Sequence, residues 1–128
     1  MLAVGNAREL IEKVWHGLGC QVELPENWGD FFEYTGLVPT EYDDRRAYAR
    51  MHFRGKAVFR HKGSFFAIYT RDVSRSGIAF YYMEQLFPGA RGRIWLPNGL
   101  SHDVEIARCK RRHKSCYECG AKFIAGEE

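Results

Sequence analysis

The sequence lacks any long hydrophobic run. Its longest apolar stretch, residues 65–69, has about five residues, whereas a helix that spans a membrane needs roughly 20. Residues 1–13 also lack the basic start and apolar core of a secretory signal. The sequence therefore predicts neither a membrane span nor a secretory signal. Its 4 cysteines then suit a reducing compartment, and we expect a cytoplasmic protein.

Internal repeats and low-complexity tracts are absent as well. Hydrophobic residues make up 45% and charged residues 27% of the chain, which contains 9 Phe, 7 Tyr and 3 Trp. This composition excludes disorder, a collagen helix and a coiled coil as the main state. At 128 residues the chain has the length of one domain, so we expect a globular protein with its own hydrophobic core.

Basic residues are scarce in the first third of the chain and abundant after it. Residues 1–44 carry 2 basic and 9 acidic side chains, a net charge of −7, whereas residues 45–128 carry 17 basic and 7 acidic side chains, a net charge of +10. Arginine supplies 13 of the 19 basic residues, and its planar guanidinium suits contacts with a phosphate or a guanine edge. Two interpretations remain open, an anionic partner for the second part or a solvated basic surface balanced by the acidic segment.

The first segment carries a helix signal followed by an irregular stretch. Asn6 is a candidate N-cap with Glu9 three residues on, and one apolar stripe at helical spacing predicts a helix over residues 6–18. The residues of this stripe are Leu10, Ile11, Val14, Trp15 and Leu18. Residues 26–44, named here the acidic arm, show no sustained period. We expect the aromatic residues of the arm to dock on the following domain: Trp28, Phe31, Phe32 and Tyr34.

From residue 47 the pattern changes to period two. Met51, Phe53, Ala57 and Phe59 alternate with residues of the other, solvent-facing side, as in a strand with one buried face: His52, Arg54, Lys56, Val58 and Arg60. Further strands are predicted over residues 65–71, 77–82, 93–96, 104–110 and 117–124, with turns between them. This spacing favours a mainly β fold, a small antiparallel barrel or sandwich, over a βαβ fold. We divide the chain into residues 1–44 and a β domain at residues 45–126.

The sequence RRAYAR, residues 45–50, lies directly before the first predicted strand. Arg46 and Arg50 are four residues apart, so in an extended chain they project to the same side at about 13 Å. Such a pair can hold two parts of one anionic ligand, through bidentate hydrogen bonds to phosphate or to guanine. An arginine pair on a wet surface is the alternative interpretation.

The sequence DVSRSG, residues 72–77, lies between the second and third predicted strands. It describes a tight turn in which Asp72 and Ser74 can accept backbone hydrogen bonds and Gly77 permits positive φ or a close approach. As a binding element, Asp72 can accept from the N1 and N2 groups of guanine, and Ser74 can face a phosphate. Both interpretations of this sequence, a structural turn and a ligand site, remain possible from the residues alone.

Taken in order, RRxxxR, a hairpin of strands and DxSxxG resemble the PilZ family of bacterial cyclic di-GMP receptors. PGARGRIWLP and YECGAKF, residues 88–97 and 117–123, are similar to later strands of that family. The resemblance covers residues 45–126 and implies a six-stranded antiparallel PilZ-type β-barrel that binds cyclic di-GMP and signals to a protein effector, with no further cofactor and no catalysis. It also implies the binding residues: Arg45, Arg46, Arg50, Asp72, Ser74 and Gly77. The family's barrel is commonly followed by a helix, and here the N-terminal helix is the candidate replacement.

The cysteines raise the competing possibility of a zinc site. Cys109, His113, Cys116 and Cys119 lie within eleven residues, and CxxC is a common zinc half-site. In the strand predicted here, however, Cys116 and Cys119 point to opposite faces, whereas zinc needs them to converge. We therefore expect reduced thiols and no metal.

Other function classes find less support. Ser101, His102 and Asp103 are consecutive and cannot form a catalytic triad, and no phosphate-binding loop or HExxH motif is present, so we do not expect an enzyme. Two alternatives remain. A small basic barrel can bind single-stranded nucleic acid by stacking on exposed aromatic rings, and residues 65–69, 80–82 and 108–114 are candidates for that surface. A PilZ-like protein-interaction module that binds no nucleotide is the second.

The acidic arm also suggests a hypothesis about switching. Asp43 and Asp44 lie directly beside Arg45 and Arg46. Without nucleotide, these carboxylates are expected to occupy the arginine loop, so that an anionic ligand displaces them and the arm moves.

Overall fold

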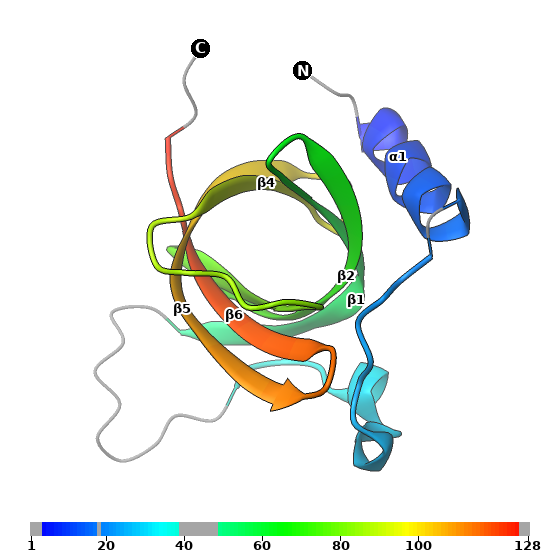
Figure 1. Ribbon diagram of the computed structural model, residues 1–128, viewed down its shortest axis with the longest axis vertical. Coiled ribbons are helices and arrows are strands. Elements are labelled where there is room, and N and C mark those ends of the chain that lie inside the picture. The colour runs from blue at the N-terminus through cyan, green and yellow to red at the C-terminus, as the bar shows by residue number, and fades with distance from the viewer. Residues whose placement is uncertain (1–3, 18, 39–48, 126–128) are drawn as a thin grey trace.

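The computed structural model describes residues 4–17, 19–38 and 49–125. In these residues, helix α1 (Val4–Gly17) precedes two short 3-10 helices, η1 (Glu26–Trp28) and η2 (Phe31–Glu33). The strands that follow are β1 (Arg50–His61), β2 (Ser64–Ser74), β3 (Gly77–Tyr82), β4 (Arg91–Trp95), β5 (Ser101–His113) and β6 (Cys116–Phe123). All strand pairs are antiparallel, and the order β1-β2-β3-β6-β5-β4 closes into a barrel (Figure 1). The predicted six-stranded barrel is confirmed.

The alternation of side chains along the strands produces the barrel interior. One face of each strand contributes to a single buried cluster, in which the rings of Phe59 and Phe80 lie 5.1 Å apart. The fully buried members of this cluster include Ala57, Phe59, Ile68, Phe80, Ile94, Val104 and Cys119. Burial of this apolar surface is the main stabilising contribution to the fold.

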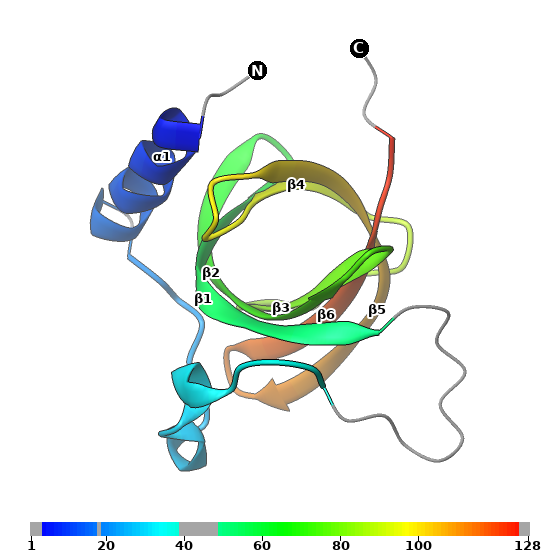
Figure 2. The ribbon, with the colours of Figure 1, turned by 180° about the vertical axis from the view of Figure 1, so that it is seen from behind.

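Helix α1 covers part of the outer surface of the barrel. Its stripe residues Ile11 and Val14 are buried against Val58, Ala67 and Trp95, which point outward from β1, β2 and the end of β4. The indole Nε1 of Trp15 donates a hydrogen bond of 2.9 Å to the carbonyl of Ala57. The helix therefore lies outside the barrel against β1 and β2, as both views of the molecule show (Figures 1 and 2).

The described part of the acidic arm packs beside the same strands. Phe31 is 2% exposed and contacts Tyr69 and Tyr81, with ring centroids 5.9 and 5.6 Å away. The guanidinium of Arg54 lies 4.4 Å from the centre of the Phe31 ring. Docking of the aromatic arm is thus found for Phe31 and for Trp28, whose ring lies 5.2 Å from that of Tyr81, whereas Phe32 and Tyr34 remain about half exposed.

Several local predictions differ from the structure. Helix α1 begins at Val4, so Asn6 lies inside the helix and is not its N-cap, and Leu18 lies outside the described residues. Met51, predicted on the buried face of β1, is 50% exposed, because it lies near the start of the strand, where it bridges to Leu37 outside the sheet. β5 is longer than predicted because its hairpin with β6 continues to His113 and Cys116.

No helix among residues 4–17, 19–38 and 49–125 combines the length and the apolar character needed to cross a membrane.

Candidate functional site

A shallow pocket on the outside of the barrel brings the two sequence motifs together. Arg50 enters it from the first residue of β1, and Asp72, Ser74 and Gly77 enter from the end of β2 and the start of β3. The hairpin geometry explains this arrangement, since Arg50 is directly opposite Ser74 in the β1–β2 ladder. The opposite wall consists of residues from β5 and β6: Ala107, Arg108, Gly120, Ala121 and Lys122.

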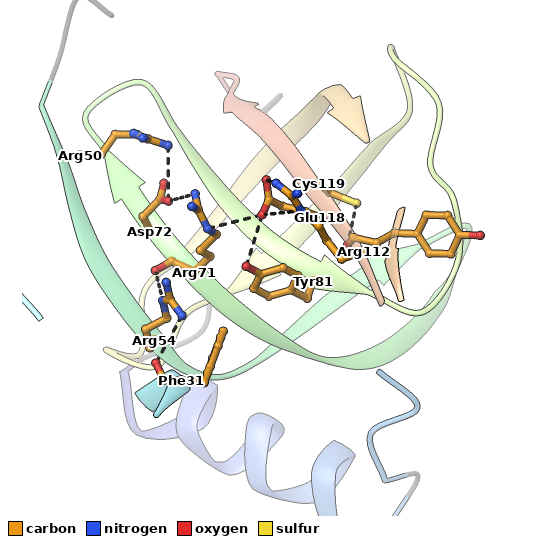
Figure 3. A network of polar contacts seen from close by, with 10 residues as sticks. Phe31, Arg50, Arg54, Arg71, Asp72, Tyr81, Arg112, Glu118 and Cys119 are labelled. Carbon is orange, nitrogen blue, oxygen red and sulfur yellow. Dashed lines mark hydrogen bonds and ion pairs between the residues drawn. The ribbon is translucent and has the colours of Figure 1, made fainter. Parts of the chain in front are cut away.

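Asp72 is a buried carboxylate held between two arginines. It is 2% exposed, and its Oδ2 atom lies 2.6 Å from Nη1 of Arg71 and 3.5 Å from Nη1 of Arg50 (Figure 3). A buried charge needs such partners because removal from water is costly. The structure therefore explains Asp72 by ion pairing with Arg50 and Arg71, rather than by the backbone capping that the turn motif predicts.

Ser74 and Gly77 have separate structural roles. The hydroxyl of Ser74 accepts a hydrogen bond of 3.2 Å from the backbone N–H of Ser76, as predicted for a tight turn. Gly77 pairs with Lys122 of β6, and a Cβ atom at this position would lie 2.3 Å from the carbonyl oxygen of Ala121. Gly77 does not have a positive φ, so close approach of β3 to β6 is the reason for glycine here.

A chain of polar contacts connects the pocket to β6 and to the described part of the arm. Arg71 pairs with Asp72 and, through Nε, lies 3.5 Å from Oε1 of Glu118 (Figure 3). Arg112 binds the same carboxylate at 3.1 Å, and the hydroxyl of Tyr81 donates to it at 3.3 Å. The backbone carbonyl of Arg71 also accepts a hydrogen bond of 3.2 Å from Nε of Arg54. Arg71 therefore connects Asp72 of the pocket to Glu118 on β6 and, through its backbone carbonyl, to Arg54 beside the arm.

The electrostatics of this chain of contacts favour the ionised form of Glu118. Burial acts to raise the pKa of Glu118, but the hydrogen bond from Arg112 and the charges of Arg71 and Arg112 outweigh it, so the pKa lies below its usual range. A carboxylate with a depressed pKa stabilises the fold above the pKa of the unfolded chain and loses that contribution as pH falls. We thus expect this stabilisation to begin to fall at the unfolded pKa, about 4.3, and to be lost as pH falls through the lower pKa of the folded protein, which urea denaturation at several pH values measures.

Some predicted residues are not placed by the structure. Arg45 and Arg46, and the neighbouring carboxylates of Asp43 and Asp44, lie outside the described residues. The first described member of the RRxxxR motif is thus Arg50, whose side chain is 15% exposed.

Sequence reasoning missed the β5–β6 wall of the pocket. Arg108 lies directly opposite Gly120, and a Cβ atom at Gly120 would lie 2.9 Å from Cζ of Arg108. Glycine therefore leaves the space that the Arg108 side chain uses. In the part of the chain that the structure describes, no carboxylate pairs with Arg108, whereas Lys122 pairs with Glu105 at 3.1 Å. Gly120 and Lys122 lie on the face of β6 that lines the pocket, and the β5–β6 register brings them beside Arg108.

The cysteines occupy the faces that the strand alternation predicts. Cys119 belongs to the barrel interior, whereas Cys116 packs outside β6 with Val22, Phe31 and Tyr81. Across residues 4–17, 19–38 and 49–125, no three His, Cys, Asp or Glu side chains are grouped as metal ligands. The absence of stoichiometric zinc stays a prediction, which metal analysis of the purified protein checks.

The aromatic rings proposed for nucleic-acid stacking pack within the protein. Phe80 and Tyr82 are buried in the barrel core, and Phe66 packs against that core with its ring 5.2 Å from Tyr82. Tyr81 is 2% exposed and packs beneath the arm. Stacking of bases needs exposed rings, so residues 65–69 and 80–82 do not form such a platform.

We expect Arg71→Ala to lower the free energy of unfolding by about 1–3 kcal/mol, because it removes the 2.6 Å partner of buried Asp72. Urea denaturation measures this change. Arg91→Ala is the matched control, since Arg91 is 67% exposed in its pair with Glu105 and such surface pairs contribute little. Equal effects of the two substitutions would contradict the structural role of Arg71.

Comparison with known proteins is consistent with this geometry. A search of curated proteins gives no significant match. A family model described as "PilZ domain" matches residues 44–128, which is about two thirds of the chain and contains the whole barrel and both motifs. The sequence motifs, the closed antiparallel barrel and this match agree, and the chain belongs to the PilZ domain family.

Proposed function

We propose that this chain is a receptor for cyclic di-GMP and that it passes the signal to a protein effector by a conformational change. PilZ domains are binding domains rather than enzymes, and cyclic di-GMP is the typical ligand of the family. The observation that carries the proposal is the convergence of Arg50, Asp72, Ser74 and Gly77 in one surface pocket.

The chemistry of the pocket suits a guanine nucleotide. Arg46 and Arg50 would donate to the phosphates and to guanine O6 and N7, and Asp72 would accept from guanine N1 and N2. Ser74 would donate to a phosphate oxygen. The pocket holds about 250 Å³, small for a ligand site, so a dinucleotide would extend beyond it over the barrel surface.

The β5–β6 wall adds a further contact to this proposal. Arg108 is exposed at the pocket and pairs with no described carboxylate, so its guanidinium is available to a phosphate. Lys122 already has Glu105 as a partner at 3.1 Å. We therefore assign Arg108 the larger share of phosphate binding on this side.

Titration calorimetry with cyclic di-GMP tests the function directly. Saturable binding of cyclic di-GMP, without comparable binding of GTP or of a short single-stranded oligonucleotide, is the expected result. The affinity for cyclic di-GMP should fall only weakly as salt increases, because this ligand carries only two phosphates. A nucleic-acid strand that contacts many phosphates would instead lose affinity with a slope of roughly 0.7 per contact. Steep salt dependence with the oligonucleotide would favour the nucleic-acid alternative, and no binding of either ligand would favour a protein-interaction module.

The arm offers a route from the pocket to an effector. The backbone N–H of Val38 donates to the carbonyl of Arg50 at 2.9 Å, and His52 donates to Gly36 at 2.8 Å. Residues 36–38 are thus bonded to the strand end that carries Arg50. A ligand that orders Arg50 would stabilise this attachment, since binding stabilises the state that binds.

The exposed apolar side chains of the arm provide a surface for that effector. Four of the six exposed large hydrophobic residues among the described residues lie on the arm or at the start of β1: Phe32, Tyr34, Leu37 and Met51. Exposed carboxylates lie on the same arm: Glu26, Asp30 and Glu33. Charge complementarity therefore favours an effector segment that combines apolar and basic residues.

Amide exchange tests whether the arm responds to the nucleotide. We expect cyclic di-GMP to slow exchange at Val38 and His52 by more than it slows exchange in β4, which contributes no residue to the pocket. Mass spectrometry or NMR measures the difference, and Arg50→Ala should abolish it. If the nucleotide changes exchange at Val38 and His52 no more than it changes exchange in β4, the arm is only a packed extension.

The hypothesis for Asp43 and Asp44 has its own test. If these carboxylates compete with the ligand, Asp43→Asn combined with Asp44→Asn should tighten cyclic di-GMP binding a few-fold at low salt, because exposed ion pairs contribute about 0–1 kcal/mol each. Calorimetry at several salt concentrations should show the gain shrinking as salt increases. An unchanged affinity at low salt would dismiss the competition.

A further inference from the structure

Two cysteine side chains face each other across the β5–β6 hairpin. Cys109 and Cys119 are directly opposite in the antiparallel ladder, and their Sγ atoms lie 3.5 Å apart. The Cα atoms of directly opposite residues in such a ladder are about 4.5–5.5 Å apart. This separation falls within the range of about 4.4–6.8 Å that disulfides span, so the two sulfurs can join without separating the strands.

We propose that Cys109 and Cys119 form a thiol oxidation site, which reacts with a hydroperoxide and closes to an intramolecular disulfide. The function proposed for the pocket does not depend on this reaction. The two cysteines differ in accessibility, because Cys109 is partly exposed whereas Cys119 is fully buried. Burial also raises the pKa of Cys119 strongly. Cys109 is therefore the thiol that meets the oxidant, and Cys119 is the thiol that resolves the product.

The reaction balances with one equivalent of hydrogen peroxide. The Cys109 thiolate attacks one peroxide oxygen, the O–O bond breaks, and the released hydroxide takes a proton to form water. Cys109 is then a sulfenic acid. The sulfur of Cys119 attacks the sulfur of Cys109, the S–O bond breaks, and the hydroxide leaves as a second water with the thiol proton. Two thiols have lost two electrons in total, and the peroxide has gained them.

The other two cysteines define the alternative pairing. Cys20 and Cys116 belong to the cluster on the outer surface of the barrel, where Cys20 donates to the carbonyl of Ala67 at 3.3 Å. Burial raises the pKa of Cys116 to about 12, and its side chain is fully buried. These two thiols are on the opposite face of the sheet from Cys119, so neither can replace Cys109 in the proposed bond.

The bond would change the hairpin next to the candidate ligand pocket. Arg108 and Gly120, which line the pocket, are the sequence neighbours of the two cysteines. A disulfide here would close a short loop and restrict the unfolded chain, which stabilises the native state. We expect oxidation to raise the melting temperature by about 5–10 °C.

Oxidation of the full-length folded protein tests the proposal. The reduced chain is treated with a small excess of hydrogen peroxide under native conditions, digested without reductant and analysed by mass spectrometry. The expected product is a linked peptide pair containing Cys109 and Cys119, with reactive thiols falling from four to two. Dithiothreitol should restore both thiols and the lower melting temperature. Circular dichroism establishes that the protein remains folded throughout.

Matched variants distinguish disulfide formation at Cys109 and Cys119 from nonspecific oxidation of other thiols. Cys109→Ser should fold, because the side chain is partly exposed, and should form no disulfide and show no peroxide-dependent rise in melting temperature. Cys116→Ser should form the same Cys109–Cys119 disulfide as the native protein and show the same peroxide-dependent rise, from a lower initial melting temperature because a hydroxyl replaces a buried thiol. A link between Cys20 and Cys116, retention of four thiols, or oxidation of Cys109 that stops short of a disulfide would each overturn the proposal. None of these outcomes depends on nucleotide binding, so failure here is distinct from failure of the proposed receptor function.

Discussion

Arg50→Ala and Arg46→Ala are each expected to weaken cyclic di-GMP binding by tenfold to a hundredfold or more while leaving the barrel folded. Loss of a charge-assisted hydrogen bond typically costs about 1.5–3 kcal/mol, which corresponds to that range. For Arg50 the effect has a second source, since its guanidinium lies 3.5 Å from the carboxylate of Asp72. Removal of Arg50 therefore also changes the position of a proposed guanine acceptor.

Calorimetry with cyclic di-GMP measures this loss, and circular dichroism must remain native-like. Arg91→Ala is the matched control, because it removes an equal charge at a residue of β4 that does not line the pocket. Arg108→Ala is expected to weaken binding to a smaller extent, since its contact with the ligand is proposed for phosphate alone. Unchanged affinity in both the Arg46 and the Arg50 variant would refute the assignment of the site.

Gly77→Ala is expected to lower the free energy of unfolding by about 1–3 kcal/mol or more, a large effect for the addition of one methyl group. The added Cβ atom would lie 2.3 Å from the carbonyl oxygen of Ala121, a backbone atom that cannot rotate away. β3 must then separate from β6 at the pair of Gly77 with Lys122. Because Gly77 and Lys122 both line the pocket, nucleotide binding should weaken as well.

Urea denaturation measures the stability of this variant. Gly29→Ala is the control, because Gly29 has φ −58° and ψ −25°, and no atom lies within 4 Å of its added Cβ. Its free energy of unfolding should change by less than about 0.5 kcal/mol or increase slightly, since alanine restricts the unfolded chain. A Gly77→Ala protein as stable as the Gly29→Ala protein would mean that close strand approach is not the reason for glycine at residue 77.

The strands could be predicted because their signal is local. The alternation in residues 117–123 assigned Cys119 and Cys116 to opposite faces, and the structure places Cys119 in the core and Cys116 outside it. The same local signal was incomplete for β1. Val58 was expected to be solvent-facing and is fully buried, because α1 covers that side of the strand. A period-two pattern cannot show which outer surface a distant segment will cover.

The residues of the candidate site also divide into those that were expected and those that only the structure shows. Arg50, Asp72, Ser74 and Gly77 belong to two motifs whose common site was expected from the resemblance to the PilZ family, and the β1–β2 hairpin brings them to one pocket. Arg108 and Gly120 come from a second hairpin, and Arg71 connects to Glu118 across the sheet. These residues carry no motif that distinguishes them from an ordinary basic surface.

The sequence by itself therefore determined the barrel strands and the buried faces of most of them, and its resemblance to the PilZ family named the pocket residues of β1 to β3. Only the tertiary structure decided the β5–β6 wall of the pocket, the attachment of the arm through Arg54 and Arg71, and the approach of Cys109 to Cys119. The physical reason is the range of the interactions. Side-chain alternation acts over neighbouring residues, whereas contacts between separate strands depend on a register that closes only when the whole barrel forms.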